Sequence, residues 1–240
     1  MVSAMDVVTE RPTERTRYAA LARTTGIIGI AFLVLLFGPI IALASAGEPP
    51  LEATAAEAVT YFSNIEATWA QLVIAASTLG MIGSLWFFVA FGFLLGRAEG
   101  DPPWRSTIAT LSGGLLAAYG LVGASWAAAS LHGGRITPEV ADYAYAVGNV
   151  GFANAWIALA SFALCSGWVI LATGVLERWM GWWVVVAGLG LVVARFVWTT
   201  EFWSVWYMLF WLWVIVVCIR LIRRPDRWSS AARSGQPRSS

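Results

Sequence analysis

Residues 203–224 read WSVWYMLFWLWVIVVCIRLIRR, a stretch in which seventeen uncharged residues are followed by three arginines within five positions. About 20 apolar residues in a helix cross the ~30 Å hydrocarbon layer of a bilayer. Arginines next to such a helix mark its cytoplasmic end. This stretch therefore predicts a membrane-spanning helix whose last turn faces the cytoplasm.

The rest of the chain has the same character, since 59% of its 240 residues are hydrophobic, 12% are charged and the mean hydropathy is +0.71. Such a composition does not fit a water-soluble surface. The ten-residue alternation of a barrel strand is absent, so the spans must be helices. We predict an all-α, polytopic transmembrane bundle (residues 26–222) with six spans, at 26–46, 69–96, 106–131, 147–173, 181–198 and 203–222.

The arginines predict which way the bundle faces. All fifteen basic residues are arginine, and with the N-terminus inside the cell only Arg135 and Arg195 lie on the outer side. Both termini are therefore expected in the cytoplasm, as polar tails at 1–25 and 223–240, the second one basic and disordered. Ala44-Ser45-Ala46 has the form of a signal-peptidase site, but the long apolar run favours an uncleaved anchor.

Two outer loops carry signals for short interfacial helices. In the first outer loop, Pro49-Pro50 and Glu52 resemble a helix start, and apolar residues then recur at spacings of three and four as far as Trp69. Before the fourth span, in the third loop, Thr137-Pro138-Glu139 combines an N-cap residue, a proline at the first helical position and an acid in the first turn.

Small residues line one face of the third span. Gly113, Ala117 and Gly120 lead a stripe that continues at the same spacing, and such stripes let membrane helices approach closely. We therefore expect the third span at the centre of the bundle, with Gly80 of the second span against its stripe.

Polar side chains at membrane depth are costly and are candidates for function. By the predicted topology they gather in the outer third, which predicts a shallow polar cup that opens outward. Its members are Glu66, Gln71, His132, Asn149, Asn154, Arg195 and Glu201. For Arg195 and Glu201, a local ion pair is the simpler interpretation. Asn154 shares its helix face with Ser161 and Cys165, and for this face the simpler interpretation is hydrogen bonding between helices.

Aromatic residues line the outer half of the sixth span. Trp206 and Phe210 belong to this stripe, which is either a wall for a lipid-like or isoprenoid ligand or, as we favour, packing.

Several classes of chemistry lack their residues. The chain has no lysine, so a Schiff base is excluded, and it has one histidine and two cysteines, Cys165 and Cys218, within apolar runs. We expect no metal, no cofactor and no nucleic-acid partner. The expected partners are membrane lipids, and a hydrophobic small molecule or a membrane protein.

The segment Leu176-Glu177-Arg178-Trp179-Met180-Gly181-Trp182-Trp183, followed by Ala187-Gly188, resembles a family of small bacterial integral-membrane proteins. The resemblance implies about six helices, an ordered outer loop after the first helix and a turn between the inner ends of two late helices. That family has no established activity, so it implies no catalytic residue. Together with a composition like that of high-GC, actinobacterial genomes, it implies a bacterial plasma membrane.

Three functions compete at this point. The first is a non-enzymatic accessory or ligand-binding protein that uses the outer cup. The second is an intramembrane enzyme acting on an isoprenoid or lipid-like substrate, with Glu201 or Glu66 as general acid and with Trp206 and Phe210 stabilising a carbocation. The third is a small permease, which would need a polar path that reaches Ser84 and Ser161 from both sides.

Overall fold

The computed structural model describes residues 12–44, 53–65, 67–120, 128–132, 136–198 and 200–230. Within these ranges the regular elements are helices, which confirms the predicted all-α class. The main helices are α1 (Pro12–Ala44), α2 (Ala55–Asn64), α3 (Ala67–Glu99), α4 (Trp104–Gly120), α6 (Pro138–Thr173), α7 (Arg178–Phe196), α8 (Phe202–Arg223) and α9 (Asp226–Ser230).

Five helices are long and apolar enough to cross a membrane. They contain the segments Thr16–Pro39, Thr68–Glu99, Pro138–Thr173, Arg178–Phe196 and Phe202–Arg223. The predicted span at 106–131 corresponds to α4, which has 17 described residues, while 121–127 lie outside the described residues. The chain is thus an all-helical protein with the composition and helix lengths of a multi-pass membrane protein.

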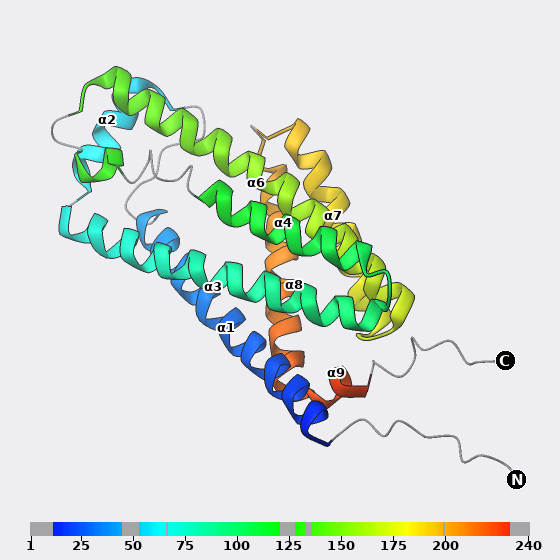
Figure 1. Cartoon of the computed structure of the whole chain (residues 1–240). Helices are drawn as coiled ribbons and strands as arrows, with labels where there is room; N and C mark the ends of the chain where they lie inside the picture. The colour runs from blue at the N-terminus through cyan, green and yellow to red at the C-terminus, as the bar shows by residue number, and fades with distance from the viewer. Residues whose placement is uncertain are drawn as a thin grey trace, which may run out of the picture.

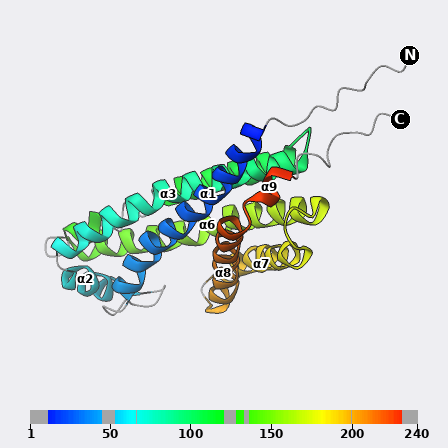
Figure 2. The ribbon, with the colours of Figure 1, turned by 90° about the horizontal axis from the view of Figure 1, so that it is seen from below.

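The helices lie in a bundle with two distinct ends (Figures 1 and 2). In Figure 1, α3, α4 and α6 run side by side, α7 lies next to α6, and α8 crosses behind them. The start of α1 and the whole of α9 lie at one end, and α2 lies at the other. We call these the α9 end and the α2 end.

The central helix is α6, and the prediction that the third span occupies this place is wrong. Helix α6 packs against α2, α3, α4 and α7, whereas α4 packs against α3 and α6. The small residues are used pairwise instead: a Cβ on Gly113 would meet Phe88 of α3, and one on Gly80 would meet the backbone of α1 at Leu36. Each glycine contacts a different neighbouring helix, so the stripe on α4 does not place α4 at the centre of the bundle.

Glycines also bring α6 and α7 together at their α9 ends. A Cβ on Gly167 would lie 2.5 Å from Val185 of α7, and one on Gly181 would lie 2.8 Å from Leu171 of α6. Because these glycines have no side chain, the backbones of α6 and α7 can approach closely, as is usual where membrane helices pack.

At the α2 end a second, smaller apolar cluster lies apart from the main core. It joins α2, the start of α3, residue 129 and the start of α6, and includes Phe62 and Tyr145. Helices α3 and α6 reach this cluster because they have 33 and 36 residues. At 1.5 Å per residue they are roughly 50 Å long, so they must tilt within a ~30 Å layer or extend beyond it.

The helix predicted between the first two spans exists, but it begins later than predicted. Thr54 is its N-cap and forms a capping box with Glu57, so the helix begins at Ala55, beyond Glu52, and its acid in the first turn is Glu57. It ends at Asn64 and is separate from α3. The predicted proline start lies outside the described residues.

The second predicted loop helix is not a separate element. Thr137 is the N-cap and Pro138 opens the helix, as predicted, but this helix is α6 itself.

Both polar tails contain helix, which the tail predictions did not include. Helix α1 begins at Pro12, well before residue 26. In the C-terminal tail, Asp226–Ser230 forms α9, and Trp228 is only 2% exposed, with its ring against Phe91 of α3. The prediction of a disordered tail is therefore wrong for α9, while 231–240 lie outside the described residues.

Candidate functional site

Two of the predicted site residues meet beside the middle of α6. Arg195 lies in the last turn of α7, and Asn154 lies on the neighbouring α6. Arg195 donates hydrogen bonds from Nε and Nη2 to Asn154 Oδ1, at 3.2 and 2.8 Å. The interhelical hydrogen bond predicted for Asn154 is thus present, with a cation as its partner.

The predicted ion pair between Arg195 and Glu201 is absent. Glu201 is the exposed N-cap residue of α8, and Arg195 bonds to Asn154 instead. Throughout the described part of the chain, no carboxylate lies within 4.0 Å of the Arg195 guanidinium. Arg195 is half-buried, so its charge is partly removed from water without a neutralising partner.

The bond to Arg195 fixes how the Asn154 amide is oriented. A guanidinium can only donate hydrogen bonds, so the amide oxygen must face it. The Asn154 Nδ2 group is left with two N–H donors, for which the described residues supply no acceptor.

Asn154 also lines a groove of about 380 Å³ on the surface between α4 and α6. On α6 the groove residues recur at spacings of four, three and four, as Tyr143, Val147, Val150 and Asn154. Such residues share one face of a helix. The remaining lining residues are Tyr119, Ala146 and Gly151. The groove therefore combines an apolar floor, two phenol groups and one amide that is bonded to a cation.

The other predicted members of the cup do not join this pair in a common site. His132 and Gln71 are exposed, Asn149 is buried within α6, and Glu66 lies outside the described residues. The arrangement that the structure shows is thus narrower than the predicted cup.

Trp206 and Phe210 take part in helix packing. Trp206 lies against Gly190 of α7, and Phe210 is fully buried against Phe162 and Trp213. The interpretation as packing fits these contacts. The general acid of the predicted enzyme mechanism would have to be desolvated, whereas Glu201 is exposed and Glu66 lies outside the described residues.

The polar residues that a permease would use are satisfied locally. Ser161 of α6 and Ser112 of α4 bond to each other through their hydroxyls at 2.7 Å, and Ser84 donates to the carbonyl of Met81.

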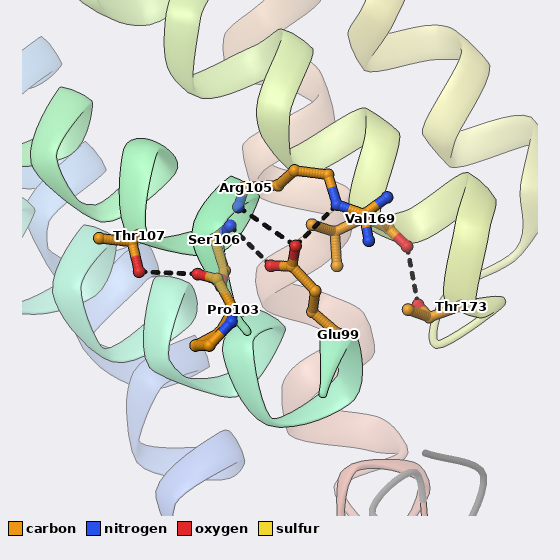
Figure 3. Close-up of polar contacts among 7 residues, drawn as sticks. All are labelled: Glu99, Pro103, Arg105, Ser106, Thr107, Val169 and Thr173. Atoms are coloured by element: carbon orange, nitrogen blue, oxygen red, sulfur yellow. Dashed lines mark hydrogen bonds and ion pairs between the residues drawn. The ribbon is translucent and has the colours of Figure 1, made fainter. Parts of the chain in front are cut away.

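At the α9 end a buried carboxylate caps α4 (Figure 3). The Glu99 side chain is 1% exposed and accepts from Arg105 Nε at 2.7 Å, from Arg105 N at 3.1 Å and from Ser106 N at 2.8 Å. Gly100, with φ of +80°, lets the chain turn directly after this residue. We call Glu99, Arg105 and Ser106 the Glu99 cap. Sequence analysis missed this feature, although Glu99 and Arg105 are separated by only one short loop.

A second carboxylate at this end gathers arginines. Glu177 Oε1 lies 3.1 Å from Arg220, 3.0 Å from Arg227 and 3.8 Å from Arg224, each measured to Nη1. Burial disfavours the charged form of Glu177, but its backbone N–H and the charges of Arg220 and Arg227 outweigh this and lower its pKa. We call these four residues the Glu177 cluster.

Within the described ranges, no group of three or more histidine, cysteine or acidic residues lies close enough together to hold a metal ion. Comparisons with known proteins yield no match to a family, to a curated protein or to a solved structure. The function must therefore be inferred from the geometry above.

Proposed function

We propose that this chain is a six-span protein of a bacterial plasma membrane, with α4 as part of the third crossing, and that its α2 end faces outward. The arginine distribution supports this orientation, because thirteen of fifteen arginines then belong to the cytoplasmic side. Kinship with the small bacterial membrane proteins is part of the proposal. It is supported by the short turn between Gly174, which ends α6, and Arg178, which begins α7.

Within that membrane the protein acts, in our proposal, as a non-enzymatic binding component for an anionic amphiphile. The carrying observation is Arg195, a half-buried cation that the described residues leave without a carboxylate. A carboxylate or phosphate head group would neutralise the charge of Arg195 and would accept a hydrogen bond from Asn154 Nδ2. The hydrocarbon body would lie along Val147 and Val150 in the groove.

The amphiphile enters from the bilayer or from the outer water layer. Two of the residues that line the groove are open to the surroundings, since Val150 is 42% and Tyr143 is 69% exposed. Tyrosine combines an apolar ring with a polar tip and suits the border between lipid and water. The same groove thus fits both parts of an amphiphile.

The test is equilibrium binding of laurate and of its methyl ester to the purified full chain in an uncharged detergent. A charged hydrogen bond is worth ~1.5–3 kcal/mol, so Arg195→Gln should weaken laurate binding about tenfold or more. Methyl laurate, which has no charge, should bind weakly to both proteins. Dodecyl phosphate, run in parallel, shows which anionic head group is preferred.

The matched control is Arg178→Gln, which removes an exposed arginine from the first turn of the same helix. It should leave laurate binding unchanged. Val147→Trp keeps Arg195 and fills the groove, so it should weaken binding of both probes. The proposal fails if the ester binds the native protein as tightly as the acid, or if both arginine variants lose equal affinity.

A further inference from the structure

The α9 end carries more positive charge than its acids neutralise. Three guanidinium groups of the Glu177 cluster converge on a single carboxylate oxygen. Arg178 and Arg223 stand next to cluster residues in the chain, and both are exposed. Five arginines therefore stand against two acids, Glu177 and Asp226, and the region keeps a net positive charge.

The arginines of this region are held in place. The α8 helix carries Arg220 and Arg223 in its last turn, and Arg224 caps it. Arg227 is held by α9, whose Trp228 is buried against α3. Because folding has already ordered these long side chains or their backbones, an anion that binds here loses less entropy on binding.

The cluster is accessible and lies at a level typical of a membrane surface. The side chains of Arg224 and Arg227 are 55% and 45% exposed. Trp179 and Trp182, in the first turn and a half of the adjacent α7, are 49% and 60% exposed. Exposed tryptophans of this kind mark the head-group region of a bilayer.

We propose that Arg223 and Arg224, supported by the Glu177 cluster, bind the phosphate of an anionic phospholipid from the leaflet at the α9 end. Arginine matches phosphate oxygens with pairs of N–H donors. Glu177 positions Arg220 and Arg227, and its negative charge offsets the repulsion between the guanidinium groups. The site is separate from the groove, and it depends only on the chain lying in a membrane.

The experiment measures binding of phosphatidylglycerol and of phosphatidylcholine to the purified full chain by native mass spectrometry from an uncharged detergent. Phosphatidylglycerol should bind more tightly, because phosphatidylcholine carries a compensating positive charge. An arginine near an anionic head group contributes enough for about a fivefold change in affinity. Arg224→Gln should therefore weaken phosphatidylglycerol binding about fivefold, and Arg223→Gln with Arg224→Gln about 25-fold.

Two controls decide between a site and simple charge. Arg17→Gln removes another exposed arginine from the same end of the bundle, on α1, and should change binding less than twofold. Inorganic phosphate, measured as a competitor, distinguishes a lipid site from a free-anion site and should not displace the lipid at millimolar concentration.

These variants leave the Glu177 contacts to Arg220 and Arg227 intact, so the fold should persist, and thermal melting checks this. Three results would overturn the proposal: equal binding of the two lipids, equal losses in the Arg17 and Arg224 variants, or displacement of the lipid by inorganic phosphate. Failure of the groove experiment with laurate would leave this site unaffected.

Discussion

Replacing Glu99 with alanine should destabilise the bundle more than any other single loss of an acid among the described residues. The carboxylate is 1% exposed and holds three donors, while the Arg105 side chain is 20% exposed. Breaking a buried ion pair costs ~3–5 kcal/mol. Because Arg105 also lies 5.3 Å from the ring of Trp168 and keeps some water, the lower end of that range, about 3 kcal/mol, applies here.

The assay is reversible unfolding in mixed micelles, followed by tryptophan fluorescence, together with thermal melting. A loss of about 3 kcal/mol lowers the melting temperature of a domain of this size by roughly 6–12 °C. Glu99→Gln keeps one acceptor oxygen and should lose about half as much. Even if the alanine variant fails to accumulate, the glutamine variant measures the effect.

The control is Glu57→Ala, which removes the acid of the exposed capping box of α2. Its hydrogen bonds face water, so the stability should fall less than with Glu99→Gln. Equal losses in the Glu99 and Glu57 variants, or a loss below about 1 kcal/mol for Glu99→Ala, would refute the reasoning, since burial is what makes the pair costly to break.

Two other outcomes follow from the packing and the charges. Gly190→Ala should destabilise the protein by ~1–3 kcal/mol, because the added Cβ would overlap the ring of Trp206. Gly114→Ala should not, because no atom beyond its own helix lies within 4 Å of the added Cβ. Equal melting temperatures of the two variants would contradict this prediction. The pKa of Glu177 is lowered in the folded state, so the carboxylate stabilises the fold above its ordinary pKa and this stability is lost as the pH falls through the lowered value. Glu177→Gln should therefore cost more stability at pH 7 than at pH 3, as measured by unfolding at both pH values; a cost that is independent of pH would count against this prediction.

The apolar spans were predictable because each is long, contains at most one arginine, near its end, and is bounded by arginine or by turn residues. Hydropathy could not find the first turns of α1, because they contain arginines and threonines that a helix tolerates at its polar end. It also could not find α9, since the burial of Trp228 depends on Phe91, which is far away in the sequence.

The candidate site was only half predictable. The spacing of Tyr143, Val147, Val150 and Asn154 places them on one face of α6, and this could have been seen in the sequence. Which residue faces Arg195 depends on how α6 and α7 pack. The nearer acid, Glu201, lies beyond the end of α7, and separation along the chain is a poor guide across such a break.

The first described helix is packed by the last ones, since α1 contacts α8 and α9 as well as α3. Because α1 is synthesised before α8, the face of α1 at Gly26, which later receives Cys218 and Leu221, lacks these partners until α8 emerges. In that interval the translocation machinery or lipid must shield this face. The packing around α1 is therefore complete only after α8 and α9 have been synthesised and have joined the bundle.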